Sequence, residues 1–307
     1  MRLGGFVIHG DSVDTLGPCL DGLQKVCDEI VSVDSFSKDG SAQLAAARGI
    51  RSILLPWQGY GAARAAAVKA LRGCDYLFYL DSDEYVLAPG LQRLRDWRES
   101  GPTAPAYRVK RRNWAEFSGR RFLYRTDSRA RLVRYDAATW TPEMIVHEAL
   151  PCGGHSRTEV IIEHRFASSL EERAAKDDRY ALLWAIRAFN HGRRPKPSWF
   201  EQLVHFGRDL LIKGALFRGG RDAIRLARVV SRYHAQKQAY LRGVQSGKYE
   251  RLVADFRAHE FASLLAALPR PGTSRGAAGN VQPPDLRSIG SYRPGPLNVS
   301  IGARRRS

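Results

Sequence analysis

The sequence predicts an α/β fold, in which a mainly parallel sheet has helices on both faces and a helical appendage follows on the C-terminal side. Over residues 4–81, short apolar runs rich in β-branched and aromatic residues alternate with amphipathic or Ala-rich stretches. Such an alternation is typical of βαβ units, whose strands are parallel. Two of the runs, 29–34 and 75–81, end abruptly in carboxylates. Because open α/β sheets bind ligands at the carboxyl ends of their strands, these acids predict a ligand site there.

Each element of this part follows from its own residue pattern. The apolar residues of 5–9 predict a strand. In 13–27, Leu16, Leu20 and Leu23 recur at helical spacing and predict an amphipathic helix. The elements expected next are a strand over 29–34, a helix over 41–48, a strand over 51–55, a helix over 61–71 and a strand over 75–81.

The pattern changes after residue 105. Strands are expected over 106–110, 121–124, 130–135 and 160–164, and helices over 168–191, 198–217 and 221–245. Residues 270–307 are rich in Gly, Pro, Ser and Arg, which predicts a disordered basic tail. We therefore expect three regions: an α/β domain over 1–165, a basic amphipathic helical region over 166–248, and a linker with the tail over 249–307.

Composition restricts the class of protein. The chain has 307 residues, 44% of them hydrophobic, and no run long enough to span a bilayer. No signal peptide is visible, and the four cysteines have neither CxxC nor zinc spacing, so we expect reduced thiols in a cytosolic protein. The net charge of +18 predicts an anionic partner: a nucleic acid, a phosphorylated glycan or an anionic lipid.

The acids that end the two runs are candidate ligand-binding residues. Asp34 and the polar residues 35–40 form either a turn that caps the next helix or a cradle in which Asp34 accepts hydrogen bonds from a nucleoside. Asp81, Asp83 and Glu84 repel one another, and a bound divalent cation would relieve that repulsion. Such a triplet can also be a solvated turn, but the buried strand leading into it favours a metal site.

Three further segments contain candidate site residues. Residues 57–61 (WQGYG) precede Arg64. They are either a simple connector between a strand and a helix, or a segment whose glycines let the backbone come close to an anionic ligand. The carboxylate of Glu148, next to His147, is either a general base or part of a surface ion pair. His164 ends an apolar strand and is either a core histidine or a further metal ligand, the interpretation that we favour.

The helical region is strongly basic. Between Arg193 and Arg242, twelve Lys and Arg residues face three acids. An apolar stripe at helical spacing (Trp199, Phe200, Leu203, Val204, Phe206, Leu210 and Leu211) is flanked by Arg208, Lys213, Arg218 and Arg221. This pattern is typical of a helix that lies on an anionic membrane surface. The alternative is a helix packed on the α/β domain with a solvated basic face.

Six segments together resemble a known family. In chain order they are VCDEIVSVDSFSKDGS, LPWQGYGAARAAAVKAL, YLFYLDSDEYV, YRVKRRNWAEFSGRR, RARLVRYDAATW and VHEAL. This ordered set, within residues 3–245, resembles family-2 glycosyltransferases of the bacterial lipopolysaccharide-core β-1,4-glucosyltransferase type. Two positions depart from the family pattern: His9-Gly10-Asp11-Ser12 replaces an Asn-Glu-Glu-like turn, and Arg64-Ala65 replaces Arg-Asn.

The resemblance implies a GT-A fold for the α/β domain and inversion at the anomeric carbon. It implies Mg²⁺ or Mn²⁺ as cofactor and a nucleotide-sugar donor, expected to be a UDP-sugar. By the same resemblance, Asp34, Asp81 and Arg64 bind the donor. Asp81 and Asp83 form the DxD element, with Asp83 on the metal, and Glu148 is the catalytic base. We add His164 as a further metal ligand beside this element.

The sequence thus predicts transfer of a hexose, expected to be glucose, to a lipid-linked or lipopolysaccharide-type saccharide. The protein is expected to be peripheral on the inner face of the cytoplasmic membrane and not to bind nucleic acid. The alternatives are an inactive GT-A-like scaffold, a sugar nucleotidyltransferase and a basic nucleic-acid-binding protein. The acidic turn at Asp11 argues against the nucleotidyltransferase, which needs a Gly-rich basic loop after the first strand.

Overall fold

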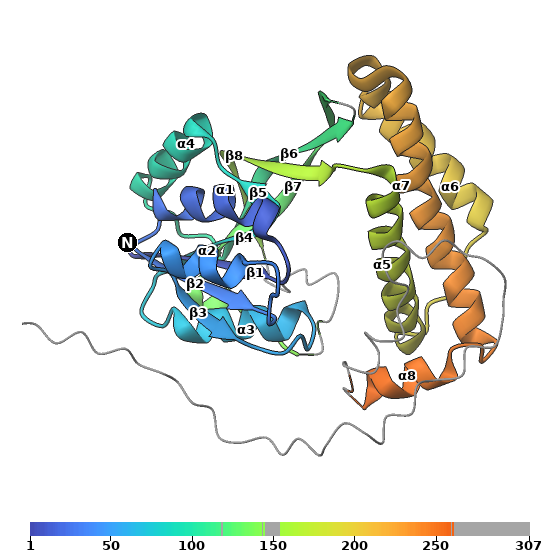
Figure 1. Ribbon diagram of the computed structural model, residues 1–307, viewed down its shortest axis with the longest axis horizontal. Helices are drawn as coiled ribbons and strands as arrows, with labels where there is room; N and C mark the ends of the chain where they lie inside the picture. Colours follow the sequence, from blue (N-terminus) through green and yellow to red (C-terminus); the bar gives the residue numbers. More distant parts are fainter. Residues whose placement is uncertain (118, 143, 145–153, 259, 261–307) are drawn as a thin grey trace, which may run out of the picture. The chain divides into compact units, whose positions relative to one another are not determined.

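The computed structural model describes residues 1–117, 119–142, 144, 154–258 and 260 (Figure 1). Its strands are β1 (Leu3–His9), β2 (Glu29–Asp34), β3 (Arg51–Leu54), β4 (Tyr76–Asp81), β5 (Glu84–Tyr85), β6 (Ala106–Phe117), β7 (Arg120–Arg134) and β8 (His155–Ala167). The helices are α1 (Val13–Gln24), α2 (Ser41–Ala47), α3 (Tyr60–Ala70), α4 (Ala88–Glu99), α5 (Leu170–Asn190), α6 (Ser198–Gly207), α7 (Ala215–Gln245) and α8 (Glu250–Arg257). A 3₁₀ turn, η1, covers Tyr135–Ala137, and a π-helical turn, η2, covers Arg208–Ile212.

The described strands form one eight-stranded sheet in the order β3-β2-β1-β4-β7-β6-β8-β5. Strands β3, β2, β1 and β4 are parallel, as the alternation of strands and helices predicts. The sheet continues through β7, which is antiparallel to β4 and forms a long hairpin with β6. Strand β8 pairs parallel with β6, and the short β5 pairs antiparallel with β8.

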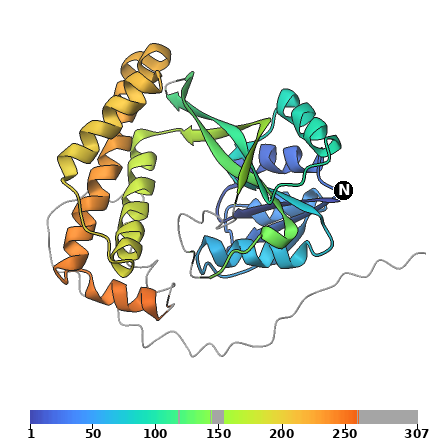
Figure 2. The same cartoon turned by 180° about the vertical axis from the view of Figure 1, so that it is seen from behind.

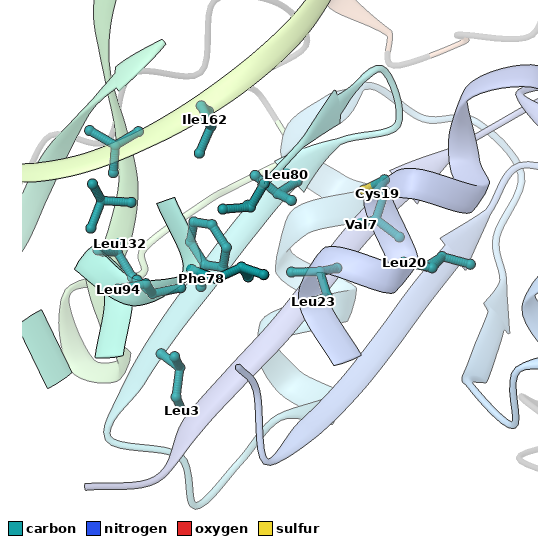
Figure 3. Close-up of a cluster of buried hydrophobic side chains, with 14 of the residues drawn as sticks. Leu3, Val7, Cys19, Leu20, Leu23, Phe78, Leu80, Leu94, Leu132 and Ile162 are labelled. Carbon is teal, nitrogen blue, oxygen red and sulfur yellow. The ribbon is translucent and has the colours of Figure 1, made fainter. Parts of the chain in front are cut away.

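Hydrophobic side chains cover both faces of the parallel strands. On one face, Leu20 of α1 and Leu94 of α4 pack in one cluster with Leu80 of β4 (Figure 3). On the other face, Ala67 of α3 packs in a second cluster with Tyr79 of β4. Tyr79 and Leu80 point to opposite sides because successive side chains of a strand alternate. The predicted α/β fold, with helices on both faces of a mainly parallel sheet, is confirmed.

The helical region packs both within itself and on the long hairpin. Helices α5 and α7 run side by side in both views (Figure 1 and Figure 2) and share a cluster that includes Ile186 and Leu241. Near its start, α7 packs on the hairpin, where a Cβ added to Gly219 would lie 2.4 Å from the ring of Phe122. Glycine at 219 therefore allows this close contact. Among the described residues, no helix is both long and apolar enough to cross a membrane.

Several elements differ from the sequence prediction. The two strands expected over 121–124 and 130–135 are one strand, β7, and the strands expected over 106–110 and 160–164 are longer. The single helix expected over 198–217 is wrong, because α6 is followed by η2 and a new helix begins at Ala215 after Gly214, whose φ is +65°. Helix α4 was not expected. Residues 250–257, in the segment assigned to a linker, form α8; the tail over 270–307 lies outside the described residues.

Candidate active site

The ends of the parallel strands bring the predicted acids to one edge of the sheet. His9, at the end of β1, is paired in register with Asp34 of β2, and Ile8 of β1 is paired with Asp81 of β4. Asp34 and Asp81 therefore lie on either side of the end of β1. This is the edge at which open α/β sheets bind their ligands.

The carboxylate of Asp34 is buried and only half satisfied. Its Oδ1 accepts hydrogen bonds from the backbone N–H and the hydroxyl of Ser37, at 2.9 and 2.6 Å. Its Oδ2 has no hydrogen-bond partner within the part of the chain that the structure describes, although Asp34 is only 1% exposed. A buried acceptor without a donor costs about 1–3 kcal/mol. Oδ2 of Asp34 is thus an unused acceptor, which an N–H or O–H group of a ligand would satisfy.

The imidazole of His9 lies beside this carboxylate. Its Nδ1 is 3.7 Å from Oδ1 of Asp34, and within the described ranges neither ring nitrogen has a hydrogen-bond partner. Burial lowers the pKa of His9, and the nearby carboxylates of Asp34 and Asp39 offset this only in part. His9 is therefore neutral at pH 7 and does not form a charged pair with Asp34.

Hydrogen bonds join the loops that follow β1 and β2. The N–H of Asp11 donates to the hydroxyl oxygen of Ser37 at 3.0 Å, and the N–H of Lys38 donates to the Asp11 carboxylate at 2.7 Å. Because Ser37 also donates to Asp34, the two loops and the buried carboxylate form one network. Asp11, which belongs to the turn that departs from the family pattern, therefore has a structural role.

The carboxylate of Asp81 is held between two guanidinium groups. Its Oδ1 accepts from Arg64 of α3 at 3.0 Å, and its Oδ2 accepts from Arg131 of β7. Burial raises the pKa of Asp81, but Arg131 and Arg64 together hold it well below its usual range. Arg64 is itself packed near the rings of Tyr79 and Trp140, at 5.2 and 5.7 Å. Asp81 thus holds the guanidinium groups of Arg64 and Arg131 in place at the edge of the sheet.

Glu84 is neutralised inside the protein. It is fully buried, and its Oε1 accepts from Arg111 at 2.9 Å and from Arg131 at 2.6 Å. Its Oε2 accepts from the backbone N–H of Asp81 at 3.1 Å. The expectation that a metal ion must relieve the repulsion among Asp81, Asp83 and Glu84 is therefore too simple, because arginine side chains already compensate two of the three acids.

The carboxylate of Asp83 is partly exposed and lies between groups of α5 and β8. Its Oδ2 lies 3.2 Å from Nζ of Lys176 in α5 and 3.5 Å from Nε2 of His164 in β8. Burial raises the pKa of Asp83, but the ammonium group of Lys176 outweighs it and keeps the carboxylate ionised. His164, predicted as a metal ligand, and Asp83 are thus brought together, although they are far apart in the sequence.

A hydrogen bond to Asn113 determines which nitrogen of His164 is free. The Asn113 amide N–H groups donate to the carbonyls of Arg111 and Arg125, so its Oδ1 acts as an acceptor for Nδ1–H of His164 at 2.7 Å. Burial also lowers the pKa of His164 and favours the neutral ring. The lone pair of Nε2 therefore points to the side of Asp83, an arrangement often found for metal-binding histidines.

Asp83 and His164 suit a divalent cation that also contacts phosphates. Within residues 1–117, 119–142, 144, 154–258 and 260, no group of three or more His, Cys, Asp and Glu side chains is placed to hold a metal ion. Mg²⁺, however, usually takes one or two protein ligands and completes its shell with substrate phosphates and water. Two donor atoms 3.5 Å apart can share one ion at coordination distances of about 2.0–2.2 Å. The two residues therefore fit such an ion.

Gly61, the second glycine of the 57–61 segment, serves the packing of the chain itself. A Cβ added to Gly61 would lie 2.1 Å from the carbonyl oxygen of Thr141, and the N–H of Gly61 donates to the carbonyl of Met144 at 2.9 Å. The backbone that approaches Gly61 is thus the segment that leads toward His147 and Glu148. Glu148, the predicted base, lies outside the described residues.

Sequence reasoning missed several residues of this site. Arg131 lies in RARLVRYDAATW, one of the segments that carry the family resemblance. Nothing in the sequence, however, identified Asp81 as its partner. Asn113 lies in an Arg-rich run beyond the strand expected over 106–110. Lys176 is on a helix that was assigned to the appendage. These residues are found only through the pairing of β6, β7 and β8 and the docking of α5.

Residues 9–144 of the chain match the family described as Glycosyl transferase family 2. Over 233 residues the chain is 29% identical to the lipopolysaccharide core biosynthesis glycosyltransferase LpsC of Rhizobium meliloti strain 1021. That match covers 72% of this chain and 84% of the relative. The family resemblance and the GT-A-like α/β fold that it implies are confirmed.

Two solved structures are also similar to this chain, with lower sequence identity than LpsC. TarS of S. aureus is 15% identical, with a TM-score of 0.42 over 86% of this chain and 54% of that chain. Glucosyl-3-phosphoglycerate synthase of Mycobacterium tuberculosis, solved with Mn²⁺ and uridine diphosphate, is 12% identical, with a TM-score of 0.35 over 53% of this chain and 72% of that chain. This chain thus spans about half the length of TarS. TM-scores below 0.5 are too low for any site to be transferred.

Proposed function

We propose that this protein is an inverting glycosyltransferase that moves a hexose, expected to be glucose, from a nucleotide-sugar donor to a saccharide acceptor. The observation that carries the proposal is the arrangement of Asp34 and the Asp81–Asp83 loop on either side of the end of β1. One side offers an unused buried acceptor, and the other offers a group for a cation that binds phosphates. A nucleotide sugar needs both, because it joins a base to a diphosphate.

Asp34 is the proposed contact for the nucleoside. A base or ribose that donates a hydrogen bond to its Oδ2 would remove the cost of an unsatisfied buried carboxylate. Uracil carries such an N–H donor, which is consistent with a UDP-sugar. The bonds from Ser37 to Oδ1 keep the carboxylate in place, so the acceptor is positioned before the ligand arrives.

The diphosphate is proposed to lie near Asp81, Asp83 and His164. Asp83 and the Nε2 lone pair of His164 would hold Mg²⁺ or Mn²⁺, which when bound would act as a Lewis acid on the departing diphosphate. Asp81 would contribute by aligning Arg64 and Arg131 at the same edge, where their positive charge favours the phosphates.

The acceptor hydroxyl is proposed to lose its proton to Glu148. The hydroxyl oxygen then forms the bond to the anomeric carbon as the bond from that carbon to the diphosphate breaks, which inverts the configuration. This role comes from the resemblance of the VHEAL segment to the family. The contact of Gly61 with Thr141 and Met144 supports it, because it ties the preceding segment to the helix that contains Arg64.

The acceptor is proposed to be a lipid-linked or lipopolysaccharide-type saccharide at the cytoplasmic face of the membrane. The 29% identity to LpsC supports this class of acceptor. The net charge of +18 is also consistent with it, because such saccharides carry phosphate groups and lie in an anionic leaflet.

The test measures nucleotide release by the purified protein from a panel of nucleotide sugars, with Mn²⁺, with Mg²⁺ and with a chelator. Slow, cation-dependent release from one donor would support the proposal and identify that donor. If no donor is hydrolysed and no nucleotide binds, the chain is an inactive scaffold. If instead the protein binds DNA in a salt-dependent way that Asp83→Asn leaves unchanged, the nucleic-acid alternative holds.

Two variants separate the proposed roles. Asp83→Ala should abolish cation-dependent activity and leave the fold intact, since the carboxylate is at the site and not in the core. Full activity in Asp83→Ala would contradict the metal assignment. Glu148→Gln should lower turnover much more than donor affinity, because a base acts in the transition state. A loss of donor affinity alone would make Glu148 a binding residue.

A further inference from the structure

An apolar surface patch is concentrated in one short segment of the helical region. Among the described residues, twelve large hydrophobic side chains are exposed, and seven of them lie between residues 199 and 217. These seven, which we call the apolar patch, are Trp199, Phe200, Leu203, Val204, Leu211, Ile212 and Phe217. Ile212 and Phe217 are 80% and 82% exposed. Exposed apolar side chains gathered in this number within one segment mark a contact surface and not an ordinary solvated one.

The patch covers one side of α6. At about 100° per residue, Trp199, Phe200, Leu203 and Val204 fall within an arc of about 140°. The opposite side of α6 packs on α7, where the rings of His205 and His234 stack with their centroids 3.3 Å apart. Figure 2 shows α6 lying along α7. The apolar side of α6 is therefore not used by the fold that the structure describes.

The π turn continues the patch beyond α6. In η2, Asp209 and Leu210 are buried, whereas Leu211 and Ile212 are exposed. The chain then turns at Gly214, and Phe217 in the first turn of α7 is exposed again. The exposed side chains thus extend across the corner between two helices. Leu210 was part of the apolar stripe expected from the sequence, but it does not belong to the apolar patch. It is 7% exposed and lies in the core.

The charge around the patch is positive. Residues 193–221 contain seven basic residues, Arg193, Arg194, Lys196, Arg208, Lys213, Arg218 and Arg221, which we call the basic rim. The segment has two acids, and both are turned inward. Asp209 is 1% exposed and accepts from Arg125, Tyr124 and Arg208 of the rim itself, and the side chain of Glu201 is 17% exposed and paired with Lys196. An approaching surface therefore meets apolar groups in a segment whose net charge is positive.

We propose that the apolar patch and the basic rim dock on an anionic lipid bilayer. The apolar side chains would enter the boundary between headgroups and acyl chains, while the rim would contact lipid phosphates. A second copy of this chain would bring a rim of the same sign against this one, and the net charge of +18 adds to that repulsion. Nucleic acid would neutralise the rim but leave Ile212 and Phe217 in water. The inference stands on this surface and does not require the transfer reaction.

The test measures binding of the full-length protein to vesicles of phosphatidylcholine with phosphatidylglycerol, and to vesicles of phosphatidylcholine alone, by co-sedimentation. The wild type should bind the anionic vesicles, and added salt should weaken that binding. The double variant Ile212→Ser/Phe217→Ser should bind at least about tenfold more weakly, because two large apolar side chains would no longer be buried in the lipid boundary. Both side chains are exposed, so the variant should unfold at the temperature of the wild type.

The matched control is Leu54→Ser/Leu87→Ser, which removes two other exposed leucines, 58% and 46% exposed and outside the patch. Its vesicle binding should equal that of the wild type. Substitution of Trp199 by Phe should also remove the blue shift of tryptophan emission that anionic vesicles cause.

Three results would overturn the proposal. The wild type could fail to bind anionic vesicles, the patch variant could bind as well as the wild type, or sedimentation in solution could show a wild-type dimer that the patch variant dissociates. The last result would make a second copy the occupant. Hydrolysis of soluble nucleotide sugars, measured on the same variants, separates the two proposals: vesicle binding without hydrolysis by any variant would contradict the proposed function and leave the docking surface intact.

Discussion

Nζ of Lys176 in α5 lies 3.2 Å from Oδ2 of Asp83, so a cation from the helical region is paired with the acid proposed to bind the metal. His164 approaches the same oxygen at 3.5 Å. An ammonium group and a divalent cation cannot both occupy this position. Because the Lys176 side chain is 48% exposed, it can move into solvent when another cation arrives.

Removal of this ammonium group should strengthen metal binding. In Lys176→Met, we expect the affinity for Mn²⁺ to rise about two- to fivefold, because a half-exposed ion pair contributes up to about 1 kcal/mol. Titration of the free protein with Mn²⁺, followed by electron paramagnetic resonance, measures the change. Lys69→Met, on the exposed side of α3, is the control and should have no effect. An unchanged affinity in Lys176→Met would show that the lysine does not compete with the metal.

Asp34→Asn should separate stability from binding. The amide oxygen can still accept from Ser37, but an NH₂ group replaces the unused Oδ2 and cannot accept from a base. We expect tighter folding, since a buried and unsatisfied charge disappears, and at least about a tenfold loss of nucleotide affinity. Thermal unfolding and calorimetric titration with UDP measure the two effects. Unchanged UDP affinity would argue against a contact between Asp34 and the nucleoside.

Gly61→Ala should disturb the segment that leads toward Glu148. The new Cβ would lie 2.1 Å from the carbonyl oxygen of Thr141, so the segment must shift. We expect a loss of turnover with a smaller change in donor affinity, together with a lower unfolding temperature. Gly207→Ala is the matched control, because its Cβ would meet nothing within 4 Å and helical alanine is favoured by about 0.5–1 kcal/mol. Normal turnover in Gly61→Ala would show that this contact does not position the catalytic segment.

The histidine stack between α6 and α7 should make stability depend on pH. Burial, with help from the positive charges of His205 and Lys237, lowers the pKa of His234 to about 2. Between that value and the ordinary pKa of about 6.5, the unfolded chain binds a proton that the folded chain does not. Stability therefore falls as the pH drops below about 6.5, by on the order of 1–2 kcal/mol at pH 5.

His234→Phe keeps a ring against His205 but cannot titrate. Denaturant unfolding at pH 7 and at pH 5 should therefore differ less in His234→Phe than in the wild type. An equal pH dependence in both proteins would mean that other groups cause it.

The acids of the site could be located from the sequence because their strands have clear patterns. Asp34 and Asp81 each end a run of apolar residues, and buried faces determine the register of such strands. Their partners could not be located in this way. Arg131 is 50 residues from Asp81, and Lys176 is 93 residues from Asp83. Only the tertiary fold brings these charges together.

The long hairpin was predicted in fragments for a related reason. Arg111 of β6 and Arg131 of β7 are 7% and 5% exposed, whereas hydropathy assigns arginine to solvent. Both are buried because Glu84 compensates them, and Arg111 also pairs with Asp127. Register shifts next to Arg108 and Trp114 further interrupt the alternation expected of a strand. Helix α4 was missed because Pro89 and Gly90 at its start resemble a turn.

The contact between α7 and the hairpin has a consequence for how the chain unfolds. Phe122 and Tyr124 of β7 share a buried cluster with Leu226 and Val230 of α7. Neither the sheet nor the helices can therefore lose structure without exposing apolar surface of the other. Heating should melt residues 1–258 in a single calorimetric transition, and a protease that cuts after β8 should yield an aggregating fragment instead of a stable one.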